Sequence, residues 1–74
     1  MRQATIQRQV GERLRELRKA RGLTQEGLAE RADVDRGFIS EMEVGDRNPS
    51  IWVMYRLALG LGVQPSELLP DYED

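Results

Sequence analysis

Apolar residues recur along the chain at helical intervals, in short segments separated by glycine and proline. In the first segment, Ile6, Val10, Leu14 and Leu17 follow one another in steps of four, four and three residues. These steps place all four side chains on one face of an α-helix. Most of the remaining positions are polar or basic. Gly22 then predicts the end of this helix, because glycine readily adopts the left-handed conformation that closes a helix.

A second helix is predicted from about residue 25 to Ala32. Thr24 is a favourable N-cap, and Leu23 and Leu28 have the spacing of a hydrophobic staple around it. Asp33 occupies the turn that follows, and aspartate is one of the few non-glycine residues that tolerate a positive φ.

A third helix begins close behind the second and is predicted to end at Gly45. Asp35 can cap it, with Val34 and Ile39 again spaced as a staple. Its predicted inward edge consists of Phe38, Ile39 and Met42. Only two or three residues link the two helices, so they cannot pack antiparallel along their length. The short link therefore predicts the steep crossing of a helix-turn-helix.

The remaining residues predict a fourth helix and a short fifth one. Ser50 caps the fourth helix and Gly62 closes it. Its predicted core face consists of Ile51, Met54, Leu57, Ala58 and Leu61. Pro65 suits the first turn of the fifth helix, with Leu68 and Leu69 as its buried residues. No segment has the pattern of a strand pair, so we expect an all-α domain of five helices.

The composition limits the possible functions. The 74 residues suit a single domain spanning 1–74, with the helix-turn-helix at about 24–44 and an acidic tail at 70–74. No cysteine or histidine is present, which excludes a disulfide framework, a Cys-ligated zinc site and a histidine general base. The carboxylates are scattered, with no nucleophile–base pair. We therefore expect no enzyme activity, no cofactor and no metal, and no membrane segment suggests a location other than the cytoplasm.

The charge is distributed unevenly. Residues 1–36 carry nine basic and six acidic groups, whereas residues 37–74 carry two basic and seven acidic groups. The net charge of −2 therefore conceals a basic N-terminal half. On the first helix, we expect Arg13, Arg15 and Lys19 to supply at most long-range attraction to a polyanion.

The third helix offers a face that could read DNA. Its predicted outward residues are Arg36, Gly37, Ser40 and Glu41. An α-helix fits the major groove of duplex DNA, where arginine can donate two hydrogen bonds to guanine O6 and N7. Glu41 can accept from a cytosine amino group, can pair with a nearby arginine, or can simply face solvent.

Several ordered blocks of residues resemble one family. The blocks are Thr24-Gln25-Glu26-Gly27-Leu28-Ala29, then Val34-Asp35-Arg36-Gly37-Phe38-Ile39-Ser40, then Glu43, Gly45 and Arg47-Asn48-Pro49-Ser50. Together they resemble the phage-repressor/Cro (Xre-type) helix-turn-helix family over about residues 9–69. The Asp-Arg-Gly-Phe-Ile-Ser block is also similar to controller proteins of restriction–modification systems. The resemblance implies a phage-repressor-like fold and a transcriptional regulator that binds double-stranded DNA in a sequence-specific way.

The resemblance also implies roles for single positions. It assigns base reading or groove lining to Arg36, Gly37, Ser40 and Glu41. It assigns DNA-backbone contacts to Gln25, Phe38, Arg47 and Asn48. It assigns an ion bridge between the first and third helices to Arg18 and Glu43.

The chain departs from the family pattern at three positions. Gly27 replaces a common acidic residue, and Gly37 places no side chain where many relatives read a base. Glu41 puts an acid on a helix face that meets the groove. Specificity is therefore expected to depend heavily on Arg36.

The fourth helix carries a second apolar stripe, at Trp52, Tyr55 and Leu59. This stripe cannot point into the same core as the first one. We expect it to form a homodimer contact with Leu69 and Tyr72, because exposed aromatic stripes are unusual on small monomers. The alternative is that Trp52 folds back over the fifth helix within one subunit.

A homodimer would read a palindromic operator through two half-sites. The competing function is a protein-interaction or antitoxin-like module that binds DNA only secondarily, for which the stripe and the acidic tail are also suited. The residues do not indicate the operator, the regulated genes, the sign of regulation or a contact with RNA polymerase.

Overall fold

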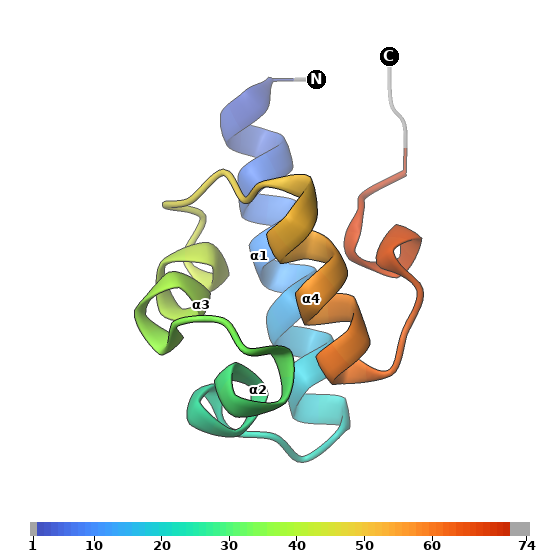
Figure 1. Cartoon of the computed structure of the whole chain (residues 1–74). Helices are drawn as coiled ribbons and strands as arrows, with labels where there is room; N and C mark the ends of the chain where they lie inside the picture. The colour runs from blue at the N-terminus through green and yellow to red at the C-terminus, as the bar shows by residue number, and fades with distance from the viewer. Residues whose placement is uncertain (1, 72–74) are drawn as a thin grey trace.

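The structure is a computed structural model that describes residues 2–71. Its elements are α1 (Gln3–Ala20), α2 (Gln25–Ala32), α3 (Arg36–Glu43), α4 (Ile51–Leu61) and the 3-10 turn η1 (Pro65–Leu68). Figure 1 shows α3 on one side of the α1 and α4 pair and η1 on the other, with α2 below. The described residues contain no strand, so the predicted all-α class is confirmed. Within the same range, no helix has the length and apolar character needed to cross a membrane.

Side-chain caps begin two of the helices as predicted. The Thr24 hydroxyl accepts a hydrogen bond from the Gly27 backbone N–H at 2.9 Å, and the Ser50 hydroxyl accepts one from the Val53 N–H at 3.2 Å. The predicted cap at Asp35 is wrong in one respect: the residue precedes α3, but its carboxylate accepts no backbone N–H. Its ψ of 132° differs from the 164–167° of the other two caps, and its carboxylate lies 3.1 Å from the position that a β-carbon would take on Gly37.

All four α-helices end in the same motif. At the end of α1, the Gly22 N–H donates to the Lys19 carbonyl and the Leu23 N–H donates to the Arg18 carbonyl. The equivalent left-handed residues are Asp33, Gly45 and Gly62, each with the same two backbone bonds. This is the Schellman arrangement, which satisfies carbonyls that a helix end leaves unpaired. The predicted positive φ of Asp33 is confirmed at 55°.

The predicted fifth helix is a single 3-10 turn rather than an α-helix. Leu69, which follows it, has an extended backbone with ψ 141°. Pro70 comes next, and a residue that precedes proline is driven out of the α region. The short turn buries Leu68, as expected, but Leu69 is 55% exposed, so the predicted burial of Leu69 is wrong.

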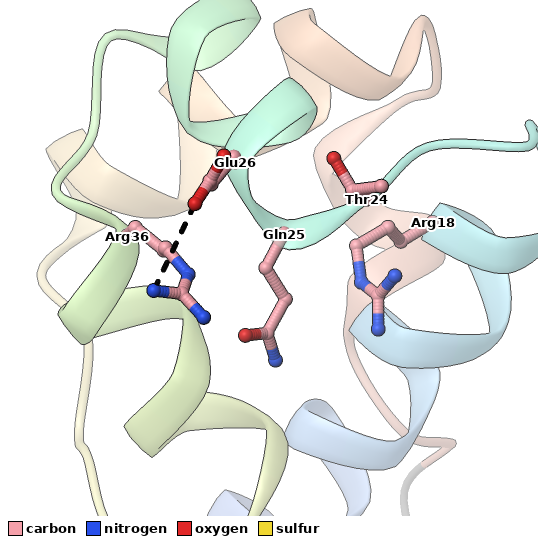
Figure 2. Close-up of a pocket in the computed structure, with 5 residues that line it drawn as sticks. All are labelled: Arg18, Thr24, Gln25, Glu26 and Arg36. Atoms are coloured by element: carbon pink, nitrogen blue, oxygen red, sulfur yellow. Dashed lines mark ion pairs between the residues drawn. The ribbon is translucent and has the colours of Figure 1, made fainter.

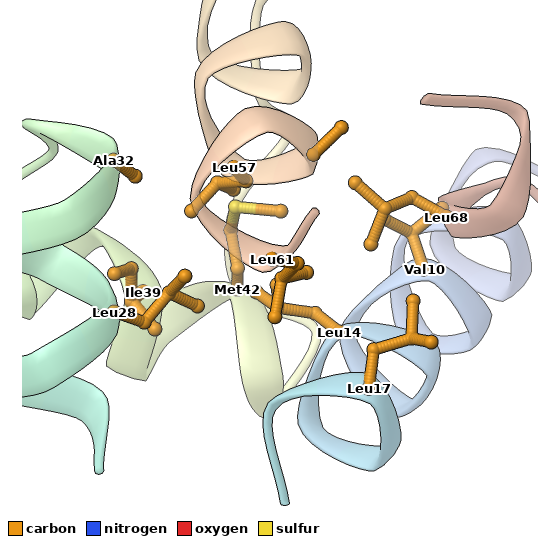
Figure 3. Close-up of a cluster of buried hydrophobic side chains, with 11 residues drawn as sticks. Val10, Leu14, Leu17, Leu28, Ala32, Ile39, Met42, Leu57, Leu61 and Leu68 are labelled. Carbon is orange, nitrogen blue, oxygen red and sulfur yellow. The ribbon is translucent and has the colours of Figure 1, made fainter. Parts of the chain in front are cut away.

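Every element contributes to one hydrophobic core (Figure 3). Its buried members are Val10, Leu14, Leu17, Leu28, Ala32, Ile39, Met42, Leu57, Ala58, Leu61 and Leu68. Ile51 was expected on the core face of α4 but is 78% exposed. The reason is that α2 packs on α4 near Gly60, at its C-terminal end, and leaves the first turn of α4 uncovered.

Two glycines set the spacing between helices. A methyl group placed on Gly11 would lie 1.9 Å from the Met42 carbonyl oxygen, so α1 and α3 approach too closely for any side chain there. A methyl group on Gly60 would lie 3.0 Å from the Ala32 β-carbon, so α4 also approaches α2 closely, although less so than α1 approaches α3. These contacts hold α2 and α3 at fixed positions on the α1 and α4 pair.

Candidate nucleic-acid interface

The turn between α2 and α3 leaves one face of α3 open. The left-handed conformation of Asp33 reverses the chain, and α3 starts three residues later. The predicted outward residues of α3 are all exposed: Arg36, Gly37, Ser40 and Glu41. The buried side chains of Ile39 and Met42 fasten the opposite face to the core.

A buried ion pair fixes α3 to α1. The Arg18 guanidinium donates from Nε to Glu43 Oε2 at 2.7 Å and from Nη2 to Glu43 Oε1 at 2.9 Å. A third hydrogen bond runs from Arg18 Nη1 to the Leu23 carbonyl at 2.8 Å. Gln25 Nε2 donates to the same Glu43 carboxylate at 3.1 Å. The side chains of Arg18 and Glu43 are only 11% and 4% exposed. This buried network joins the start of α2 and the end of α3 to α1.

The network keeps both groups charged. Burial raises the pKa of Glu43. Hydrogen bonds from Arg18 and Gln25, together with the charges of Arg18 and Arg15, lower it by more than burial raises it, so the pKa lies below its usual value. The hydrogen bond to Glu43 raises the pKa of Arg18, burial lowers it and attraction to Glu43 raises it, for a net increase. Each partner is therefore stabilised in its ionised form by the other.

A hollow of about 400 Å³ lies at the N-terminal end of α2 (Figure 2). It is lined by Arg18, Thr24, Gln25, Glu26 and Arg36. Figure 2 shows the Gln25 side chain between the guanidinium groups of Arg36 and Arg18. Arg36 is 3.9 Å from the Glu26 carboxylate, with both side chains largely exposed, so this pairing holds Arg36 only weakly. A helix N-terminus beside a cation is chemically suited to an anionic group such as phosphate.

The loop after α3 folds back onto it. Arg47 Nε donates to the Glu41 carboxylate, and the Arg47 guanidinium lies 4.8 Å above the centre of the Phe38 ring. The Phe38 ring itself is half-buried against the core, and Asn48 is exposed beside Arg47. Of the three possibilities left open for Glu41, the structure shows pairing with an arginine.

One further basic residue reaches this surface. Arg15 lines a second hollow, of about 280 Å³, together with Gln25, Ser40 and Val44. The sequence predicts at most long-range attraction from Arg15, and the structure places it at the edge of the α3 surface. Its position three residues before Arg18, on the same helix face, was the signal that could have placed it beside α3.

The second stripe of α4 is exposed, and so is Leu69. The exposed fractions are 72% for Trp52, 60% for Tyr55 and 67% for Leu59. The alternative that Trp52 folds over the fifth helix is therefore wrong; the indole instead carries the Arg56 guanidinium, 5.8 Å from the ring centre. Tyr72 lies outside the described residues. We call the exposed side chains of Ile51, Trp52, Tyr55, Leu59 and Leu69 the α4 patch.

Arg56 also connects this patch to the helix-turn-helix. Its Nε donates to the Ala32 carbonyl at the end of α2 at 2.8 Å, while Arg31 of α2 donates to the Gly60 carbonyl at the end of α4 at 3.0 Å. Each helix thus supplies an arginine to a C-terminal carbonyl of the other, where cations are favoured. Among residues 2–71, no group of three or more acidic side chains is placed to hold a metal ion.

A model of the helix-turn-helix family, HTH_3, matches residues 14–68. The chain belongs to this family. It is 39% identical over 69 residues to "Control protein C.MunI" of Mycoplasma sp, covering 92% of this chain and 93% of that one. It is 40% identical over 60 residues to the HTH-type transcriptional regulator y4dJ of Sinorhizobium fredii, covering 81% and 78%. The crystal structure of the restriction-modification controller protein C.AhdI from Aeromonas hydrophila superposes with a TM-score of 0.83 at 43% identity, covering 85% and 96%.

The chain is therefore an HTH-type DNA-binding transcriptional regulator of a non-enzymatic family. The predicted resemblance to Xre-type proteins, including controller proteins, is confirmed.

Proposed function

We propose that this regulator binds a palindromic double-stranded DNA operator as a homodimer, with α3 of each subunit in the major groove. The observation that carries the proposal is the exposed row on α3, held in place by the buried Arg18–Glu43 pair. A rigid support matters because base reading requires hydrogen-bonding groups to be positioned before binding.

Arg36 is the proposed main base reader. It lies at the N-terminal end of α3, where side chains of a recognition helix reach base edges, and its weak pairing with Glu26 leaves it free to reorient. Gly37 has no side chain to project from this part of α3, so the helix backbone can approach the groove closely. Ser40 is small and polar and can contact either a base or a phosphate.

Phosphate contacts are proposed on both sides of α3. The α2 N-terminus, with Gln25, offers one anion site, and the loop residues Arg47 and Asn48 offer the other. Such contacts orient a protein on the duplex without reading sequence. Arg15 is positioned to add to them.

The second copy of this chain is the proposed occupant of the α4 patch. The patch adjoins an apolar hollow of about 310 Å³ between α4 and η1, lined by Ile51, Met54, Tyr55 and Leu69 among others, into which a partner's side chain can pack. Two copies related by a two-fold axis would present two α3 helices to half-sites about 34–36 Å apart.

Replacement of Arg36 tests the base-reading part of this proposal. Arg36→Ala should weaken binding to duplexes selected by the wild type from a random pool by roughly 1–3 kcal/mol, and should relax the preference at one base position in each half-site. Arg8→Ala is the matched control, since Arg8 is an exposed arginine of α1 paired with Glu12. An equal loss on all sequences would instead indicate that Arg36 contacts a phosphate.

Analytical ultracentrifugation tests the dimer. Trp52→Ala should shift the sedimentation of the protein towards the monomer, whereas unchanged self-association would remove Trp52 from the contact.

The exposed α4 patch is also what a protein-interaction module would use. That alternative predicts DNA binding that is nearly indifferent to salt, whereas a DNA regulator loses affinity with a slope of about −0.9 per neutralised phosphate.

A further inference from the structure

Arg47, in the loop after α3, pairs with Glu41, which belongs to the exposed face of α3 that is proposed to meet DNA. Arg47 is held at two points, by the Glu41 carboxylate and by the Phe38 ring. The side chains of Arg47 and Glu41 are 49% and 50% exposed, so solvent and DNA can reach both. In the free protein, the loop cation is therefore neutralised by an acid of the recognition helix itself.

This neutralisation has a cost for binding any polyanion. The affinity gained from one arginine–phosphate contact varies with the salt concentration to the power of about −0.9. Relative to about 1 M salt, one additional contact is therefore worth about fivefold in affinity at 0.15 M salt. Arg47 cannot supply that gain while Glu41 holds it. A free Glu41 in the groove would in turn be repelled by the phosphates unless a hydrogen-bond donor replaced the arginine.

We propose that Glu41 determines specificity by exchanging partners; this inference rests on the proposed function. On a matching site, the amino group of a cytosine donates to Glu41, and Arg47 moves from the carboxylate to a phosphate. On other sequences, either the pair stays closed and the phosphate contact is lost, or Glu41 faces the groove without a donor. Both outcomes weaken binding to incorrect sequences.

The two residues are well placed for this exchange. Glu41 lies on the same outward face of α3 as Arg36 and Gly37, while Arg47 approaches from the loop at the side. The Phe38 ring keeps the guanidinium near α3 after the carboxylate has been released, because cation–π contact does not depend on Glu41. Arg47 therefore needs only a local reorientation to meet the backbone.

The test compares Glu41→Gln with Glu16→Gln, in the full chain. Glu16 pairs with Arg13 on α1 at 3.5 Å, and Arg13 also donates to the Glu67 carbonyl, on the side of η1. Both variants change the net charge equally and keep the side-chain shape. The probes are a duplex of scrambled sequence and the duplexes that the wild type selects from a random pool.

Glu41→Gln should bind the scrambled duplex about fivefold more tightly than the wild type at 0.15 M salt. The slope of its log affinity against log salt concentration should be steeper by about 0.9, the value for one neutralised phosphate. Its selected duplexes should also lose enrichment of one cytosine in each half-site. Equal behaviour of Glu41→Gln and Glu16→Gln on the scrambled duplex, or an unchanged cytosine preference, would overturn the exchange. If the wild type itself selected no duplex, the proposed function would fail, and the exchange with it.

A double variant shows whether Glu41 acts through Arg47. In an Arg47→Ala background, Glu41→Gln should strengthen binding to the scrambled duplex no more than Glu16→Gln does. A full fivefold gain in that background would mean that Glu41 only repels phosphate, and would overturn the proposed exchange.

Discussion

Gly11 is the position at which one added methyl group should do the most damage. The methyl carbon of an alanine would lie 1.9 Å from the Met42 carbonyl oxygen and 3.0 Å from its carbonyl carbon. An ordinary carbon–oxygen contact is about 3.3 Å, so α1 and α3 would have to separate by about 1.4 Å. The obstacle is backbone inside a helix, and no side-chain rotation can relieve it.

Two opposing effects decide the sign of the change. Alanine in a helix interior is favoured over glycine by about 1 kcal/mol. Overpacking costs about 1–3 kcal/mol, and a backbone obstacle belongs at the upper end of that range. Separation of the helices would also stretch the two Arg18–Glu43 hydrogen bonds, now 2.7 and 2.9 Å. We therefore expect Gly11→Ala to lower the free energy of unfolding by at least about 2 kcal/mol.

Urea denaturation followed by circular dichroism measures this loss. With an m-value of about 1 kcal/mol/M, the midpoint should fall by about 2 M. Gly27→Ala is the matched control. Its methyl group would meet only the end of a side chain, the Thr24 hydroxyl at 3.2 Å, and the higher helix propensity of alanine should leave the midpoint unchanged or raise it. A Gly11→Ala protein as stable as the wild type would refute the close approach of α1 and α3.

Three further outcomes follow from the same structure. Glu43→Gln leaves the buried Arg18 charge unpaired and should cost about 3–5 kcal/mol of unfolding free energy, measured in urea. Because the pKa of Glu43 is lowered in the folded state, its contribution is complete above the unfolded value of about 4.3 and is lost as the pH falls through the folded pKa. Acid titration followed by circular dichroism should show that loss in the wild type and a flatter curve in Glu43→Gln. Ser50→Ala removes the cap of α4 and should lower the thermal midpoint by an amount equivalent to about 1 kcal/mol, whereas Ser40→Ala, on the exposed face of α3, should leave it unchanged.

Local signals in the sequence were sufficient for most element boundaries. The caps at Thr24 and Ser50 and the left-handed residues at 22, 33, 45 and 62 depend on conformational preferences of single residues and their immediate neighbours. The fifth element is a 3-10 turn and not the predicted helix because Pro70 restricts the backbone of Leu69, which is also a local property.

Part of the interface was equally accessible from the sequence. The helix-turn-helix and the outward position of Arg36 and Glu41 follow from helical periodicity and the short link. The partner of Glu41 does not, because Arg47 reaches it from a loop whose path no periodic pattern describes. Arg15 is a different case, because its spacing of three residues from Arg18 on one helix face is a sequence signal that indicates its place beside α3.

The sequence by itself determined where the helices start and stop and which residues α3 turns outward, because these follow from interactions within a few residues of each other. Only the tertiary structure decided how closely the helices approach, as at Gly11 and Gly60, and that Ile51 is exposed. Those features depend on which surface another helix covers. Contacts between residues far apart in the chain leave no regular spacing in the sequence.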